Sequence, residues 1–327
     1  MRILSKSDVE RLLPVEKCIP IMRDVMQLVS SGGALLPIRQ FMPIPEVEGK
    51  MAIMPGAISL PACFGIKLVC KYEREQGSQL GSHVGMVLLF DSERGIPLAM
   101  LEGSSLTAIR TSATSGLATD LLARSDANRL AILGNGEQAM RHIAAMRAVR
   151  PITQVSVWGR HLARAQEFAK KAESVFDLPV IAHPGVSEAV TGADIVCTTT
   201  AAHQPILAGS LLEPGMHINL VGAAIPSAAE VDREAVSRSR YYVDYRPAAM
   251  AAAGELLRAI ETGDVTEDCI IAEIGEVVAG VSPARQSAEE ITMYKSLGIA
   301  AQDLAAAHGL FAAAEREHAG IEVDLLL

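Results

Sequence analysis

From Asn128 onward, short apolar runs alternate with longer amphipathic segments, and this alternation narrows the possible folds. RLAIL (129–133), QVSVW (154–158) and DIVCTTT (194–200) have the length and composition of buried strands, and helix-like segments separate them. Strands that alternate with helices at this spacing form βαβ units, in which the strands lie parallel in one sheet. This part of the chain is therefore predicted to be α/β, with a doubly wound parallel sheet.

The turn after the first of these strands has the pattern of a dinucleotide-binding loop. In LAILGNGEQA, the residues Gly134, Gly136 and Ala139 match G-x-G-x-x-A between a predicted strand and a predicted helix. The first glycine permits the tight turn, the second lets the backbone approach a pyrophosphate, and the alanine keeps helix and strand close. The helix start offers free N–H groups to the phosphates. The alternative is an ordinary turn between strand and helix.

The end of the second strand predicts which dinucleotide binds. In VWGRHLAR, Gly159 stands where an acidic residue could accept hydrogen bonds from the ribose of NAD, and Arg160 and Arg164 follow. A carboxylate would repel a 2′-phosphate, whereas a guanidinium binds it. NADPH is therefore predicted over NADH, although NADH remains possible. The alternative is that Arg160 is only a solvated residue at the start of a helix.

The first third of the chain follows a different pattern. Residues 6–30 have helical spacing with Ser7 as the expected N-cap, and short apolar runs from 37 to 91 read as strands of one sheet. Arg94-Gly95 predicts a hairpin, and the small residues of 106–123 predict a closely packed helix. Residues 291–319 are expected to form one long helix that returns to this first domain.

Three cations lie in apolar surroundings with no acid close in the sequence. Arg110 stands in the small-residue helix, Arg39 in LPIRQFMPI and Lys67 in FGIKLVCKY. A buried charge without a partner costs several kcal/mol, so Arg110 needs an anion. The three cations are therefore predicted to converge on a substrate carboxylate. The alternative for Arg39 and Lys67 is the solvated face of a strand.

Composition excludes several other classes of protein. The net charge is −9, 4 % of residues are aromatic and no run of five or more basic residues occurs, so no nucleic-acid partner is expected. No apolar stretch approaches the length of a membrane span and the N-terminus carries early charges, so no membrane association is expected either. Five scattered cysteines without C-x-x-C indicate reduced thiols in a cytoplasmic protein. No metal site is expected.

Ten collinear blocks resemble the ornithine cyclodeaminase/mu-crystallin family over nearly the whole chain. They are GKMAIMPG, IKLV, SHVGMVLLFD, LTAIRTSATSGLAT, ILGNGEQA, VSVWGR, GADIVCTTT, EPGMHINLVGA, EIGEVVAG and YKSLGIAAQDLAAA. The resemblance implies a homodimer with an α+β substrate-binding and dimerisation domain, 1–120 plus 300–327. A Rossmann dinucleotide-binding domain, 121–299, is inserted into it.

The resemblance also implies roles for individual residues. Arg110 and Lys67 are expected to be catalytic and, with Arg39, to hold the substrate carboxylate. The expected cofactor contacts are Ser82, His83, Thr111, Gly134, Gly136, Glu137, Gln138, Gly159, Arg160, His161, Arg164, Thr200, Val221 and Ser296.

Two carboxylates of the cyclodeaminases are missing from this sequence. Ala223 and Ala224 occupy the region of one, an aspartate, and Ala52 stands in place of a glutamate. The expected function is therefore reduction of cyclic imino acids, Δ1-pyrroline-2-carboxylate or Δ1-piperideine-2-carboxylate, to L-proline or L-pipecolate. The proton donor stays open between Lys67 and a water molecule. The alternatives are an ornithine cyclodeaminase, an alanine-dehydrogenase-like enzyme acting on an amino acid, and a non-catalytic NADPH-binding protein.

Overall fold

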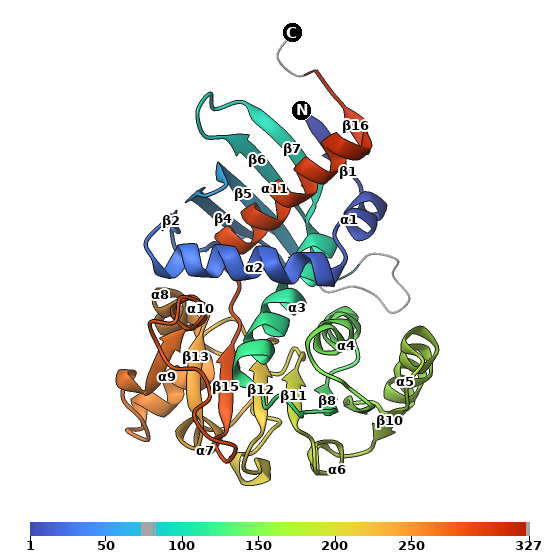
Figure 1. Cartoon of the computed structure of the whole chain (residues 1–327), viewed down its shortest axis with the longest axis vertical. Coiled ribbons are helices and arrows are strands. Elements are labelled where there is room, and N and C mark those ends of the chain that lie inside the picture. The colour runs from blue at the N-terminus through green and yellow to red at the C-terminus, as the bar shows by residue number, and fades with distance from the viewer. Residues whose placement is uncertain (73–80, 82, 325–327) are drawn as a thin grey trace. The chain divides into compact units, whose positions relative to one another are not determined.

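The computed structural model describes residues 1–72, 81 and 83–324 (Figure 1). The chain divides into two compact units: unit 1 is Met1–Arg110 with Gly298–Leu327, and unit 2 is Thr111–Leu297. Unit 1 is thus built from both ends of the chain. The division falls within a helix directly after Arg110, whereas the sequence-based boundary lay at residue 120.

Unit 1 holds one mixed sheet and three complete helices among its described residues. The strand order is β16-β1-β7-β6-β5-β4-β2, with β3 also paired to β4. The elements are β1 (Arg2–Leu4), α1 (Lys6–Leu12), α2 (Val15–Ser30), β2 (Ala34–Leu35), β3 (Gln40–Pro43), β4 (Gly49–Ser59), β5 (Ala62–Tyr72), β6 (His83–Asp91), β7 (Pro97–Glu102), the start of α3 (Gly103–Leu122), α11 (Ala300–Glu317) and β16 (Ile321–Glu322).

The predicted strands and hairpin of unit 1 are confirmed. β4 and β5 pair antiparallel along their whole length, and β6 pairs with β5 and β7. The hairpin between β6 and β7 closes where Gly95 N–H donates to the Asp91 carbonyl at 2.9 Å. Gly95 has φ +68°, a conformation that residues with a Cβ seldom adopt.

The single helix predicted over 6–30 is wrong, because the chain breaks between α1 and α2. Pro14 is the N-cap of α2, and a proline cannot donate the backbone hydrogen bond that a continuous helix requires there. The cap of α1 is Ser5 rather than Ser7. Its hydroxyl accepts from Asp8 N–H at 3.3 Å, and the Asp8 carboxylate accepts from Ser5 N–H at 3.0 Å.

One face of the unit 1 sheet packs against α11, which crosses strands β4 to β7 beside α2 (Figure 1). A Cβ on Gly56 would stand 2.8 Å from the Ala300 Cβ, and one on Gly65 would stand 2.8 Å from Leu304. Strand side chains alternate between the two faces, so Lys67, two residues after Gly65, points to the α11 side. Val87, its register partner on β6, is fully buried on that side.

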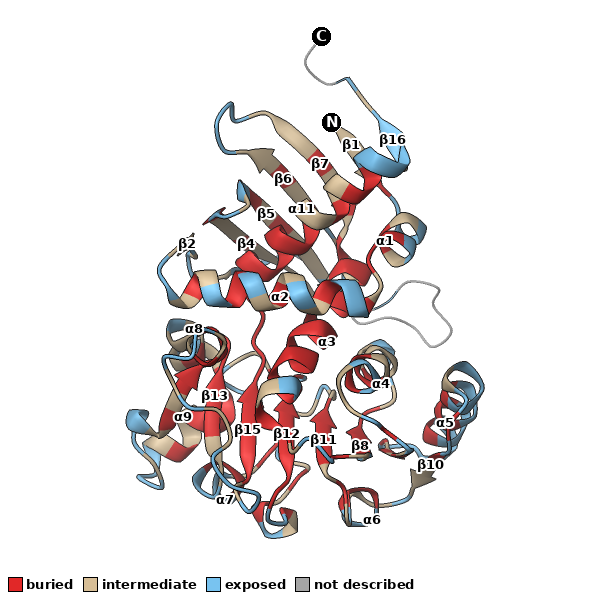
Figure 2. Ribbon diagram, viewed as in Figure 1, coloured by how far each residue is buried: buried red, intermediate tan, exposed pale blue. Residues whose placement is uncertain are grey.

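Unit 2 is the predicted doubly wound sheet, and the α/β fold class is confirmed. All strand pairs are parallel, in the order β10-β9-β8-β11-β12-β15-β13-β14, and Figure 2 shows their buried interior. The elements are β8 (Arg129–Leu133), α4 (Glu137–Val149), β9 (Gln154–Trp158), α5 (Leu162–Phe176), β10 (Val180–His183), α6 (Val186–Val190), β11 (Ile195–Thr198), β12 (His217–Leu220), α7 (Arg233–Ser237), β13 (Arg240–Val243), α8 (Arg246–Ala252), α9 (Gly254–Glu261), β14 (Ile270–Glu273), α10 (Ile274–Val278) and β15 (Thr292–Lys295).

The helix predicted over 291–319 is wrong in its first part. Thr292–Lys295 form β15, a fully buried strand between β12 and β13, and α11 begins only at Ala300. Gly298, with φ +76°, separates strand from helix because its conformation cannot continue either. No helix in the described part of the chain is long and apolar enough to cross a membrane.

Candidate active site

Lys67 and Arg110 meet at one buried carboxylate, that of Asp303. Lys67 Nζ donates to Asp303 Oδ1 at 3.1 Å and Oδ2 at 3.3 Å, and Arg110 Nε donates to Oδ1 at 2.9 Å. The side chains of Lys67 and Arg110 are each 4 % exposed, and that of Asp303 is 1 % exposed. They come from β5, α3 and α11, all within unit 1.

Arg110 was predicted to need an anion, and the chain itself supplies one in Asp303. Asp303 lies 236 positions after Lys67 and 193 after Arg110, so no local pattern could pair them. One signal was present in the sequence. Asp303 is a lone charge in IAAQDLAAA, a run as apolar and closely packed as the segment that holds Arg110.

Arg39 also binds the segment at the start of α11. Arg39 Nη2 donates to the Gly298 carbonyl at 2.7 Å, and Arg110 Nη1 donates to Gln302 Oε1 at 2.8 Å. Residues 298–303 thus contact all three predicted cations. We name Arg39, Lys67, Arg110 and Asp303 the cation cluster.

The cation cluster carries more positive than negative charge. Burial lowers the pKa of the Lys67 ammonium to about 7, a change that Asp303 opposes and that Arg110 and Arg39 reinforce. Burial alone would raise the pKa of Asp303, but Arg110 and Lys67 outweigh it and bring that pKa below its ordinary value. Lys67 and Arg110 share the Asp303 carboxylate and Arg39 binds the same segment, so the arrangement has several N–H donors that can also bind a small anion.

The glycine turn of unit 2 has the geometry that a pyrophosphate requires. Gly134 has φ +127°, and a Cβ there would stand 2.7 Å from the Thr199 carbonyl oxygen. Gly136 is the N-cap of α4 without a side-chain cap, and a Cβ on it would meet no atom within 4 Å. Glu137 and Gln138 begin the helix, and buried Gln138 Oε1 has no hydrogen-bond partner within the described residues. These features fit a dinucleotide.

The predicted 2′-phosphate contacts lie beside this turn. Trp158, the last residue of β9, is the register partner of Leu133, the last residue of β8. Gly159 is buried, and a Cβ on it would stand 3.1 Å from the Asn135 side chain. The three basic side chains that follow are exposed to solvent: Arg160, His161 and Arg164.

Sequence reasoning missed Glu230, which organises the ends of β11 and β12. Its carboxylate is 1 % exposed and accepts from Thr198 Oγ1 at 2.7 Å, from Thr200 N–H at 2.8 Å and from Gly222 N–H at 2.7 Å. Thr200 and Val221 are thereby held at the carboxyl edge of the sheet, where ligands of such folds bind. Both oxygens of Glu230 are engaged, so Glu230 does not replace the missing cyclodeaminase aspartate as a base.

The other predicted cofactor contacts occupy different environments. Ser296 directly follows β15, is buried, and its Oγ has no hydrogen-bond partner within residues 1–72, 81 and 83–324. Thr111 is buried on α3. Ser82 lies outside the described residues, and His83 is placed only through its backbone, as the first residue of β6.

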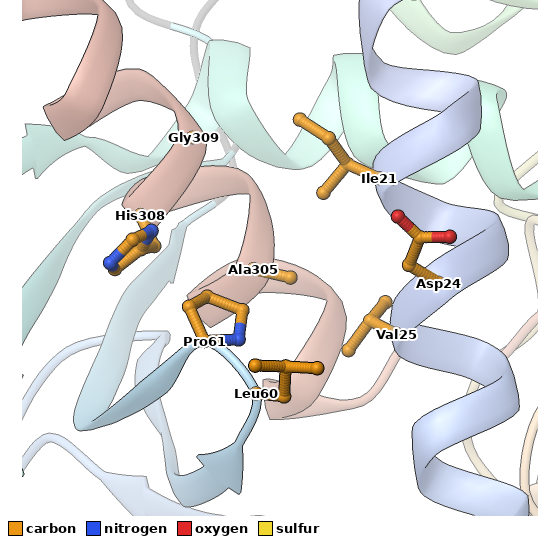
Figure 3. Close-up of a pocket in the computed structure, with 8 residues that line it drawn as sticks. All are labelled: Ile21, Asp24, Val25, Leu60, Pro61, Ala305, His308 and Gly309. Carbon is orange, nitrogen blue, oxygen red and sulfur yellow. The ribbon is translucent and has the colours of Figure 1, made fainter.

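Unit 1 also contains a hollow of about 170 Å³ between α2, the turn after β4, and α11 (Figure 3). Its wall is mainly apolar, with Asp24 and His308 as the polar members. None of the predicted site residues lines it. Within the described chain, no group of three His, Cys, Asp or Glu side chains could hold a metal ion.

Known proteins resemble this chain over nearly its full length. The family described as "Ornithine cyclodeaminase/mu-crystallin family" matches residues 1–317. Ketimine reductase mu-crystallin of Mus musculus is 38% identical over 276 residues, 84% of each chain. Delta(1)-pyrroline-2-carboxylate reductase of Bacillus cereus is 34% identical over 327 residues, 99% of this chain and 100% of that one. The solved structure of Delta(1)-pyrroline-2-carboxylate reductase of Thermococcus litoralis, in complex with NADH and L-proline, is 31% identical in sequence, with a TM-score of 0.95. The match covers 99% of this chain and 100% of that one.

Proposed function

This chain belongs to the ornithine cyclodeaminase/mu-crystallin family, and on that basis we propose that it is an NAD(P)H-dependent reductase of cyclic imino acids. Its substrate is Δ1-pyrroline-2-carboxylate or Δ1-piperideine-2-carboxylate, and its product is L-proline or L-pipecolate. The observation that carries the proposal is the cation cluster, which brings two guanidinium groups and an ammonium group together at residues 298–303 and so suits a small carboxylate.

Arg110, Lys67 and Arg39 hold the substrate carboxylate in this proposal. A guanidinium binds a carboxylate through two parallel hydrogen bonds and so orients the ring as well as holding it. Because Arg110 and Lys67 are buried, solvent screens their attraction for the anion only weakly. Correct orientation of the C=N carbon supplies several kcal/mol of the activation free energy.

Lys67 is the proposed proton donor. The reduced dinucleotide, when bound, supplies the hydride that the imine carbon accepts. The imine nitrogen must then carry a proton, and a donor works best when its pKa lies near the working pH. Burial brings the pKa of Lys67 to about 7, so its ammonium can give up a proton at neutral pH.

The cofactor preference is proposed to be NADPH over NADH. Gly159 places no carboxylate at the end of β9, and the guanidinium groups of Arg160 and Arg164 are exposed there. A 2′-phosphate forms charge-assisted hydrogen bonds with such groups. Thr111 and Ser296 are proposed to line the cofactor, and Thr200 and Val221 to lie near its nicotinamide.

A second copy of the chain is proposed to cover the free face of the unit 1 sheet. Phe64 and Phe90 stack on the face opposite Lys67 with ring centroids 5.2 Å apart. Met86 and Val84 share that face and are 41% and 37% exposed. A sheet that is apolar on both faces needs a cover on each. A homodimer provides it.

The thiols are consistent with a cytoplasmic location, which we propose as well. Cys18, Cys63 and Cys197 are buried, and every cysteine is free. Proteins of oxidising compartments instead tend to pair their cysteines in disulfides.

The missing carboxylates weigh against a cyclodeaminase. Ala223 is buried beside Glu230, and Ala52 lies on β4, so neither position offers a base. Ornithine as the sole substrate, without added NADPH, should therefore give no proline.

The decisive experiment measures NADPH and NADH oxidation with a panel of cyclic and linear imino acids. We expect turnover of the five- or six-membered cyclic 2-carboxylates. Binding of NADPH without oxidation, with every imino acid tried, would indicate a non-catalytic protein instead.

A further inference from the structure

Asp303 is the point at which Lys67 and Arg110 are joined. A single oxygen, Oδ1, accepts from both cations, at 3.1 Å from Lys67 Nζ and 2.9 Å from Arg110 Nε. Cations on β5 and α3 would otherwise repel each other. The shared oxygen therefore sets the distance between the two groups.

The first turn of α11 provides a second acceptor for Arg110. Gln302, the neighbour of Asp303, accepts from Arg110 Nη1 at 2.8 Å, and its own Nε2 donates to Met26 Sδ at 3.4 Å. Gln302 and Asp303 are both buried, so their side chains have little freedom. Two acceptors on consecutive residues thus fix the plane of the Arg110 guanidinium.

We propose that Asp303 is a positioning residue for the imine reduction: it holds the Lys67 ammonium and the Arg110 guanidinium at one carboxylate and keeps Lys67 charged for the substrate. This inference rests on the proposed function, because it assigns the anion held by these cations to the substrate. Asp303 itself acts through Lys67 and Arg110.

The charges around Lys67 set the direction of the expected effect. Burial, reinforced by Arg110 and Arg39 and opposed by Asp303, brings the Lys67 pKa to about 7. Cys18 of α2 also lies within electrostatic range of Arg110 and Asp303, but burial raises its thiol pKa to about 12, so it stays neutral. Removal of the Asp303 charge would take away an interaction that raises the Lys67 pKa, so the ammonium would lose its proton at lower pH.

The test uses Asp303→Asn and the binding of pyrrole-2-carboxylate, a planar anion without a reducible C=N bond. Calorimetry of the full-length protein from about pH 5 to about pH 9 covers the range in which Lys67 should titrate in the wild type and in the variant. We expect wild-type affinity to fall as pH rises through the Lys67 pKa. In D303N this fall should move down by about one pH unit or more, since an opposite charge at this distance shifts a pKa by that amount. At neutral pH the affinity should drop about 10-fold or more, the usual effect of removing a charged hydrogen bond.

Two further variants keep the test decisive. Asp303→Glu retains the charge but moves the carboxylate by one methylene, so the pH profile should stay near wild type while the affinity falls. Glu317→Gln removes an exposed carboxylate on the same helix, which pairs with Arg11, and should change neither the affinity nor the pH profile. NADPH binding should be equal in all variants.

Unchanged affinity and pH profile in folded D303N would overturn the proposal. If D303N does not fold, D303E decides, and wild-type affinity in that variant overturns it equally. A wild-type protein that binds the anion with this dependence on Asp303, yet reduces no imino acid, would disprove the proposed function and leave the role of Asp303 in anion binding intact.

Discussion

The Arg110 guanidinium lies directly against Gly298, so closely that no side chain fits between them. A Cβ on Gly298 would stand 2.7 Å from both Nη1 and Nη2 of Arg110. The same glycine has φ +76°, and its carbonyl accepts from Arg39 at 2.7 Å. One residue without a side chain thus brings two of the three cations to the end of unit 1 where α11 begins.

Gly298→Ala should therefore impair substrate binding more than stability. The new methyl group must displace the Arg110 guanidinium, and the weakened hydrogen bonding to the substrate carboxylate should reduce kcat/KM by about 10-fold or more. The positive φ adds a destabilisation of about 1 kcal/mol. Gly263→Ala is the matched control, since Gly263 also has φ +76° but a Cβ there meets nothing within 4 Å. Equal kcat/KM values for the two variants would contradict the close approach of Arg110 to Gly298.

Arg110→Ala should abolish most of the activity. The variant removes a buried cation that binds Asp303 and Gln302, and a charged hydrogen bond to substrate is worth roughly 3 kcal/mol, so kcat/KM should fall by at least ~100-fold. Steady-state kinetics with the best imino acid measures the decrease. Arg11→Ala, which removes an exposed guanidinium of the same unit, should retain wild-type kinetics. Unchanged kcat/KM in R110A would refute the carboxylate clamp.

The fold was largely predictable because its signals are local. The turn at Gly134 and Gly136, the strand before it and the helix after it all lie within one short segment, and the structure reproduces them. The errors come from context. A helical pattern continues through Pro14, where the missing N–H ends it, and Thr292–Lys295 form a strand because β12 and β13 lie on either side.

The candidate site was predictable only in part. Lys67 and Arg110 stand out as charges in apolar segments, but the carboxylate between them comes from the far end of the chain. Glu230 could not be predicted either, because its carboxylate accepts from the backbone N–H groups of Thr200 and Gly222, which follow two strands that only the sheet brings together. Interactions between distant segments are what local patterns cannot supply.

The pH dependence of activity should follow the charge on Lys67. Burial lowers its pKa to about 7, so the ammonium that binds and protonates substrate is present below that pH and is lost above it. The value of kcat/KM should therefore decline as pH rises through about 7. A carboxylate acting as general base would give the opposite dependence, with activity that increases as pH rises. Lys67→Met should lower kcat/KM and remove this decline. A profile that stays flat from about pH 6 to about pH 9 in the wild type would exclude Lys67 as donor.

The cofactor preference should depend on the exposed arginines after β9. Arg160→Ala and Arg164→Ala should each raise the KM for NADPH about 10-fold, the cost of a charge-assisted hydrogen bond, and leave the KM for NADH nearly unchanged. Lys170→Ala removes an exposed cation from the same helix as Arg164 and should affect neither. Equal KM values for both cofactors in the wild type would disprove the preference.

The free face of the unit 1 sheet should be the dimer interface. Met86 is 41% exposed on the face that carries the Phe64–Phe90 stack, and an aspartate at that position would bury an unpaired charge between two copies. Such a charge costs several kcal/mol, so Met86→Asp should raise the dimer dissociation constant by at least ~100-fold. Light scattering should then report the 34.7 kDa monomer in place of twice that mass. Val175→Asp, at an exposed apolar position on α5, provides the control, because it adds the same charge away from this sheet and should leave the mass unchanged. If M86D keeps the wild-type mass, another surface joins the subunits; if the wild type is itself monomeric, the apolar face needs a different cover.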